Sequence, residues 1–159
     1  MSLELDSNDL LDELELVSRQ LIEEVNDLRP NQAELKPAPD QWSPKEVLCH
    51  LHDADQIYIQ RMQKMLQEQE EEPLLRAFNA ETLAKENDYP SQDWAKALRE
   101  FITMRQQALK LFKELRLGQW YKAGMHQELG RINMFDVAQN LIEHTTRHLE
   151  QVRKAKSLA

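Results

Sequence analysis

Two of the chain's five histidines, His144 and His148, lie four positions apart in a segment whose apolar residues recur at helical spacing. This separation places both imidazoles on one face of a helix, one turn apart. The apolar pattern predicts core residues at both positions, and a buried imidazole is costly unless its ring nitrogens have partners. A divalent metal ion supplies such partners, and histidines at this spacing on a helix are a known ligand pair. Hydrogen-bonded core histidines or surface histidines also fit the spacing, so spacing alone leaves these interpretations open.

His50 is the best candidate for a third ligand. In the helix predicted around it, Leu51 marks the apolar face, His50 lies on the flank of that face, and His52 points toward solvent. We therefore predict that His50 joins His144 and His148, and that His52 is not a ligand. Three histidines leave coordination positions open on the metal, which suits catalysis better than a structural role.

A three-histidine site also predicts a cofactor and its chemistry. Neutral imidazole is a ligand for zinc, nickel and ferrous iron, so we expect one of these divalent metals. The metal would lower the pKa of a water molecule or a thiol and so produce a nucleophile near pH 7. The alternative is a non-enzymatic bundle that binds a small molecule or a partner, with structural or vestigial histidines. Beyond the metal ligands, the pattern assigns no catalytic residue.

Four further side chains are candidates for lining a substrate pocket. Arg105 lies near the core-facing stripe of its predicted helix, where it could direct a guanidinium at an anionic substrate group or extend to the rim of the bundle. Trp120, Tyr121 and His126 belong to the loop before the last helix. They are expected either at the mouth of a pocket at one end of the bundle or as packing and surface groups.

Three neighbours of His50 have simpler interpretations. Cys49 is turned about 100° away from His50 on a helix, so we predict that it fills the core and is neither a ligand nor a nucleophile. Asp53 and Asp55 could orient a ligand histidine, but solvation on the helix surface is the favoured interpretation.

Four amphipathic helices are predicted to position these residues, which favours an all-α fold, a four-helix bundle. Apolar residues recur at steps of three and four in residues 8–28, 44–72, 91–117 and 134–156. Ser43, Pro44 and Glu46 match a helix start with a capping box, the most specific local signal in the chain. Ser91 and Asn133 are the predicted N-caps of the third and fourth helices.

The connections between these helices differ in length. Residues 30–42 contain three prolines and predict an ordered loop. The acidic run 68–72 is interpreted as the solvated end of the second helix, which stops before Pro73. Residues 73–90 form a connection longer than two antiparallel neighbours need, as expected for a crossover between parallel helices. Gly118 is the predicted C-cap of the third helix.

Composition excludes several classes of protein. A length of 159 residues fits a single domain over residues 1–159, and one cysteine suits a reducing cytoplasm. The net charge of −8 has the wrong sign for tracking nucleic-acid phosphates. No apolar run is long enough to span a membrane, and the acidic N-terminus does not resemble a signal peptide. We therefore expect a cytoplasmic protein with no nucleic-acid or membrane partner.

Three motifs resemble a known family. The stretches Trp42–Asp55 (WSPKEVLCHLHDAD) and His144–Val152 (HTTRHLEQV), with Gly124–Ile132 (GMHQELGRI) before the last helix, are similar to the DinB-like superfamily of metal-binding four-helix bundles. The resemblance covers nearly the whole chain. It implies an up-down-down-up bundle with a long crossover between helices two and three. It also implies that His50, His144 and His148 bind a divalent metal.

The resemblance further implies a class of activity. The family includes bacillithiol- and mycothiol-linked transferases and isomerases, and proteins proposed to be hydrolases. We therefore expect a metal-dependent hydrolase or thiol S-transferase whose partners are a small-molecule substrate and a low-molecular-weight thiol. Bundles of this family often pair, so a homodimer is a further expectation.

Overall fold

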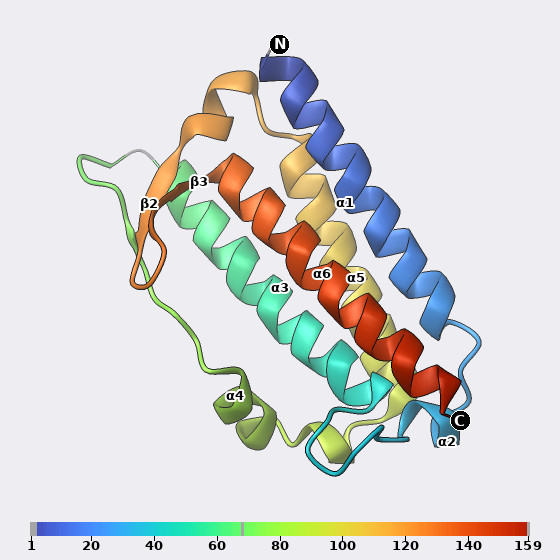
Figure 1. Cartoon of the computed structure of the whole chain (residues 1–159). Coiled ribbons are helices and arrows are strands. Elements are labelled where there is room, and N and C mark those ends of the chain that lie inside the picture. Colours follow the sequence, from blue (N-terminus) through green and yellow to red (C-terminus); the bar gives the residue numbers. More distant parts are fainter. Residues whose placement is uncertain (1–2, 68, 159) are drawn as a thin grey trace.

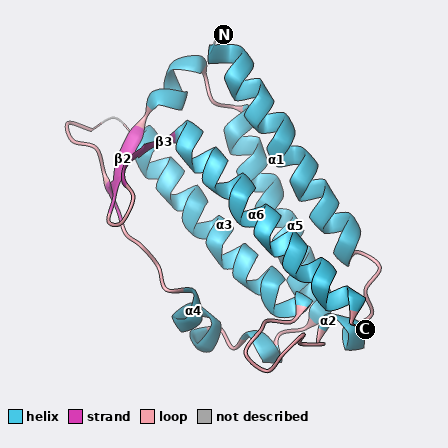
Figure 2. Cartoon of the chain, in the orientation of Figure 1, coloured by secondary structure: helices cyan, strands magenta, loops and turns pink. Residues whose placement is uncertain are grey.

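The computed structural model describes residues 3–67 and 69–158, and four long helices packed side by side dominate it (Figure 1). These helices are α1 (Leu3–Val25), α3 (Pro44–Leu66), α5 (Trp94–Lys113) and α6 (Met134–Ser157). The shorter elements, coloured by type in Figure 2, are α2 (Pro30–Ala33), α4 (Ala80–Glu86), the 3₁₀ turns η1 (Tyr89–Ser91) and η2 (Leu117–Tyr121), and strands β1 (Leu74–Leu75), β2 (Ala123–His126) and β3 (Gly130–Asn133). The four predicted helices are present, whereas the small sheet was not predicted. None of the described helices combines the length and apolar character needed to cross a bilayer.

The long helices form two closely packed pairs, α3 with α5 and α1 with α6. The connection 67–93 brings the chain back to the end of the bundle at which α3 begins, so α3 and α5 run in the same direction (Figure 1). Helix α1 is antiparallel to α5. At the start of α5, the Trp94 indole N–H donates to the Leu28 carbonyl, just after α1, at 3.1 Å. At the end of α5, Lys113 pairs with Glu15, near the middle of α1, at 2.7 Å. Each apolar stripe meets another helix, and the shared core takes residues from all four, including Leu14, Leu21, Leu51, Phe101, Phe112, Leu141 and Val152.

Two of the three predicted N-caps are correct. The Ser43 hydroxyl accepts from the Glu46 backbone N–H at 3.2 Å, and the Glu46 carboxylate accepts from the Ser43 N–H at 3.2 Å. Asn133 and Asp136 form the same reciprocal pair at the start of α6. The predicted N-cap Ser91 is wrong. Asp93 caps α5, because its carboxylate accepts from the Lys96 N–H at 3.0 Å.

The predicted helix ends are less accurate. Helix α3 stops at Leu66, with the backbone extended at Gln67, so the described glutamates 70–72 follow the helix rather than end it. Glu68 lies outside the described residues. Consecutive carboxylates repel one another, which disfavours the helix that the pattern predicted there. Gly118 belongs to η2 rather than capping α5, which ends at Lys113, and the predicted loop 30–42 contains the short helix α2.

The sheet, which was not predicted, pairs the long connection with the loop before α6 through backbone hydrogen bonds. Strand β1 pairs in parallel with β2, and β2 forms an antiparallel hairpin with β3. The Met125 N–H donates to the Pro73 carbonyl at 2.8 Å. Gly124 is required here, because a Cβ at that position would lie 2.7 Å from Leu75 Cδ1. The connection is thereby held across the outside of α3, close to the hairpin.

Arg105 lies inside the bundle and not in a pocket or at the rim, which corrects its predicted place. Its guanidinium donates to both carboxylate oxygens of Asp55, at 2.8 and 3.0 Å, and to the hydroxyls of Ser18 and Thr145, at 2.9 and 3.1 Å. The side chains of Arg105 and Asp55 are 1% and 0% exposed. Asp55 was predicted to be solvated, and that prediction is wrong. This network joins all four long helices, because α5, α3, α1 and α6 each contribute one residue.

We predict that Arg105→Met lowers the free energy of unfolding by about 3–5 kcal/mol, because it leaves the buried Asp55 carboxylate without its partner. The double variant Arg105→Met, Asp55→Leu should recover most of this loss, since it removes both charges. Urea unfolding, monitored by circular dichroism, measures the free energy of unfolding of both variants. Arg99→Met, at an exposed position of the same helix, is the control and should change stability by less than about 0.5 kcal/mol. A loss in Arg105→Met no larger than in this control would contradict the prediction.

Candidate metal centre

Three histidines from α3 and α6 converge at one point on the side of the bundle where these two helices meet. The distance from His144 Nε2 is 2.9 Å to His50 Nε2 and 3.1 Å to His148 Nε2. One ring nitrogen from each residue lies within 4.8 Å of the others, the arrangement needed to hold a metal ion. His50 is buried and the other two are half-buried. The structure thus brings together the three residues that the sequence singled out.

Local structure explains why these rings meet. The capping box starts α3 at Pro44, so His50 follows less than two turns later. On α6 the core position is taken by Thr145, which is 0% exposed, and not by the histidines as the stripe predicted. Around the axis of α6, Thr145 points into the core. His144 is rotated from that direction by about 100° and His148 by about 60°, both in the same sense. Both rings therefore flank the core stripe, and this flank faces α3.

All three rings are neutral near pH 7. Burial, with the neighbouring rings, lowers the pKa of His50 to about 3 and that of His144 to about 2. Burial also lowers the pKa of His148. A neutral imidazole has a lone pair available for a metal, whereas an imidazolium does not. The site can therefore bind a cation without first releasing protons from these rings.

The hydrogen bonds around the rings fit a metal site. His148 Nδ1 lies 2.8 Å from the Gln151 side-chain oxygen, an acceptor that keeps the ring proton on Nδ1 and leaves the Nε2 lone pair free. Nδ1 of His50 and of His144 are buried without a hydrogen-bond partner among the described residues. The three Nε2 atoms face one point, where a single cation could accept a lone pair from each ring. The donor set therefore fits a divalent metal.

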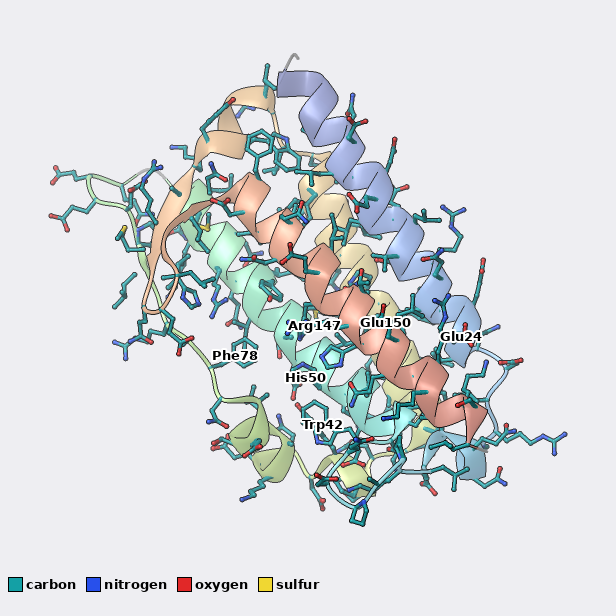
Figure 3. The ribbon with its side chains drawn as sticks, viewed as in Figure 1. Glu24, Trp42, His50, Phe78, Arg147 and Glu150 are labelled. Atoms are coloured by element: carbon teal, nitrogen blue, oxygen red, sulfur yellow. The ribbon has the colours of Figure 1, made fainter. Side chains whose placement is uncertain are left out.

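Two hollows reach the histidine cluster. The first, the hairpin pocket, has a volume of about 260 Å³ and is lined among others by Tyr58, Arg61, Phe78, His126, His144 and Arg147. The second, the Trp42 groove, has a volume of about 530 Å³ and is lined by Trp42, His50, Phe78, Ala80, His144, Arg147, His148 and Gln151. His144, Phe78 and Arg147 line both. Figure 3 shows Phe78, on the long connection, on the same side of the bundle as His50 and Trp42.

The other three predicted pocket residues lie in three different environments. His126 lines the hairpin pocket. Trp120 is buried and packs on Phe112 and Phe135, at ring-centroid distances of 5.8 and 5.0 Å, so it is a core residue. Tyr121 is 43% exposed and lies beside the acidic segment 69–72, in a different hollow. Of the four candidates, only His126 lines a hollow that the histidine cluster shares.

The neighbours of His50 form a separate polar group. His52 Nδ1 lies 3.0 Å from Asp53, whose carboxylate also accepts from the Tyr89 hydroxyl at 2.6 Å. Asp53 is therefore bonded within the protein, not simply solvated and not in contact with a ligand histidine. Cys49 is buried, and burial raises the pKa of its thiol to about 12, which agrees with the predicted core role. His52 is absent from the cluster.

Among the residues that sequence reasoning missed are Arg61, Phe78 and Arg147, which line these hollows, and Gln151, which bonds to His148. Gln151 carried a signal, because it lies three positions after His148 and so one turn further along the same face. Arg147 lies between the two histidines of α6. Arg61 and Phe78 carried no local signal, since the fold of the long connection brings them together.

Four long helices, two of which bring three histidines together, define a four-helix bundle with a candidate metal centre. The sequence profile of the DinB superfamily matches residues 13–152, and the chain belongs to that superfamily. The fold is similar to that of YfiT from Bacillus subtilis, described as "a probable metal-dependent hydrolase with an unusual four-helix bundle topology", with a TM-score of 0.79 and 18% identity over 95% of this chain and 86% of YfiT. It is also similar to TT2238, "a four-helix bundle protein", with a TM-score of 0.67 and 14% identity over 92% of this chain and 98% of TT2238. No curated protein sequence matches the chain.

The lowered histidine pKa values predict how acid destabilises the metal-free protein. Below the ordinary pKa of about 6.5, the unfolded chain binds protons at His50 and His144, while the folded chain does not until pH approaches 3. The free energy of unfolding should therefore fall as pH drops from about 6.5 toward 4, by up to about 1.4 kcal/mol per pH unit for each such histidine. His50→Gln should show a shallower fall in urea unfolding at successive pH values.

His52→Gln is the matched control, because the Asp53 bond raises the pKa of His52. Its contribution is fully present below about 6.5 and is lost as pH rises through the raised value. Removing it should therefore lower stability by a similar amount throughout the range from about 6.5 to 4 and leave the acid slope close to that of the wild type, unlike His50→Gln. Equal slopes in wild type and His50→Gln would contradict the neutral state of the cluster.

Proposed function

We propose that this protein is a divalent-metal-dependent enzyme in which His50, His144 and His148 hold one metal ion with coordination positions open toward a small-molecule substrate. The observation that carries the proposal is the convergence of three neutral imidazoles, with Nε2 distances of 2.9 and 3.1 Å, beside two hollows. Zinc, nickel and ferrous iron all suit this ligand set. The description of YfiT as a probable metal-dependent hydrolase supports the same class of activity.

The chemistry follows from the site. A divalent cation bound there supplies Lewis acidity, which lowers the pKa of a coordinated water or thiol toward neutrality. Gln151 holds the His148 proton on Nδ1 and so keeps that ring oriented toward the cluster. Trp42 packs against His50 at a centroid distance of 4.8 Å and shields it from solvent. Burial raises the pKa of Tyr58, which therefore remains a protonated hydroxyl in the hairpin pocket at neutral pH.

The two hollows support thiol transfer as well as hydrolysis. Hydrolysis needs one organic substrate besides water, whereas S-transfer needs a thiol and an electrophile at the same centre. Here the hairpin pocket and the Trp42 groove both reach His144 and share Arg147 and Phe78. A low-molecular-weight thiol in one hollow could thus meet an electrophile in the other. We propose hydrolysis or thiol S-transfer as the reaction, on one site.

We predict that His148→Gln loses bound metal and activity while the bundle still folds, since the apolar stripes of four helices carry its stability. Glutamine keeps most of the side-chain volume but replaces the imidazole nitrogen. Elemental analysis of protein purified without a metal-affinity tag measures metal per chain, and His52→Gln is the control that should retain it. Metal content in His148→Gln equal to a well-occupied wild type would refute the site.

Turnover separates an enzyme from a binding protein. Ester substrates and thiol-reactive electrophiles are incubated with the metal-loaded protein, with and without a low-molecular-weight thiol. Loss of thiol-dependent turnover in His148→Gln indicates a transferase, and loss of thiol-independent turnover indicates a hydrolase. A wild type that holds metal at the histidines and turns over neither substrate class would favour the non-enzymatic bundle instead.

A further inference from the structure

Arg61 is a buried cation in the hairpin pocket, close to the histidine cluster. It is 8% exposed and lies between two aromatic rings, 5.8 Å from the Tyr58 centroid and 5.6 Å from the Phe78 centroid. One guanidinium nitrogen donates to the Arg76 carbonyl at 2.6 Å. Its Nε is buried and has no hydrogen-bond partner among the described residues. No carboxylate in the described part of the chain pairs with it.

The contrast with Arg105 shows what Arg61 lacks. Both guanidiniums are buried, and Arg105 donates twice to the carboxylate of Asp55. Taking a charge out of water is costly unless an opposite charge compensates for it. Among the described residues, Arg61 has carbonyl and aromatic neighbours but no anion. An arginine fork with free donors next to a pocket matches the two oxygens of a carboxylate or a phosphate.

His126 adds a second donor to the same pocket. Its Nδ1 accepts the backbone N–H groups of Glu128 and Leu129, at 3.0 and 3.1 Å, so the neutral ring carries its proton on Nε2. Burial and the charge of Arg61 lower the pKa of His126, which keeps the ring in this form. The turn of the β2–β3 hairpin thus orients His126 as a hydrogen-bond donor.

The remaining charges of the pocket lie at its outer edge. Arg147 is exposed and lines both the hairpin pocket and the Trp42 groove. Glu128 and Glu143 also line the pocket, but both are exposed, and neither forms an ion pair with Arg61. The buried part of the pocket is therefore positive, and its volume of about 260 Å³ suits a small acidic group.

We propose that the hairpin pocket is an oxyanion subsite in which Arg61, with His126 and Arg147, binds the carboxylate or phosphate group of the small-molecule substrate. The inference deepens the proposed function and rests on it for the reaction. Tyr58 connects the two places, since its ring contacts Arg61 and lies 6.4 Å from the His144 ring centroid. An anion held at Arg61 would thus place the rest of the substrate next to the histidine cluster.

The test measures anion binding by metal-free protein, so it does not depend on a metal at the histidines. Inorganic phosphate and succinate are titrated separately in low-salt buffer, with calorimetry for affinity and NMR for the ring resonances of His126. We expect saturable binding of at least one probe by wild type, with movement of the His126 resonances. Arg61→Gln should weaken this binding about tenfold or more, because a charged donor is lost. Arg19→Gln, at an exposed position on α1, should bind as wild type does.

The outcomes are distinct. Tighter binding of phosphate or of succinate identifies the acidic group, and either supports the subsite. Absence of binding for both probes, or wild-type affinity in Arg61→Gln, overturns it. If Arg61→Gln does not fold, Arg61→Lys decides, since it keeps the charge but loses the planar fork. Weaker binding by Arg61→Lys supports the proposal, and unchanged affinity contradicts it. Metal retained by His148→Gln would refute the proposed function without affecting this result.

Discussion

The hydrogen-bonded ion pair of Arg105 and Asp55 is the constraint on which the bundle depends. Arg105 reaches from α5 to Asp55 on α3, Ser18 on α1 and Thr145 on α6, all within 3.1 Å. Apolar stripes tolerate small rotations of a helix, whereas a buried guanidinium needs its acceptors at defined positions. The pair therefore sets the rotation of each helix. With Thr145 turned inward, His144 and His148 must lie on the flank of α6 that faces α3.

Polar groups inside this bundle are of two kinds. Arg105 has its partners within the chain, so its network is complete and serves the fold. The histidine cluster and Arg61 are incomplete: the Nε2 atoms of the three histidines meet only one another, and Nε of Arg61 is buried without a partner among the described residues. Buried polar atoms in native proteins nearly always have partners, so unpartnered ones next to a hollow point to a ligand. The incomplete groups all lie on the same side of the bundle, around the two hollows.

The sheet and the long connection form one wall of the site on this side of the bundle. Strand β1 holds the connection against β2, and Gln127 extends the contact by accepting from the Ala77 N–H at 2.8 Å. Phe78 follows directly and lines both hollows, on the same side of the bundle as His50 (Figure 3). The crossover that joins two parallel helices thus also forms a wall of the site.

Local signals in the sequence determined the helices and much of the histidine cluster. The capping boxes at Ser43 and Asn133 act over three residues, so they are present in the sequence and in the fold alike. The spacing of His144 and His148 and the flank position of His50 likewise follow from helix geometry, and the motifs around them identified the family.

What the sequence could not determine depends on contacts between distant segments. Arg105 was interpreted as a pocket residue because its three partners come from three other helices. Helix α3 was predicted too long because the apolar pattern does not register repulsion among consecutive glutamates. Strand β1 is two residues long and pairs with residues about 50 positions away, and Arg61 lines a pocket only because that pairing folds the connection beside it. Periodicity reports which face of a helix is apolar, but only the tertiary structure decides which buried polar group finds a partner inside the chain and which remains available for a ligand.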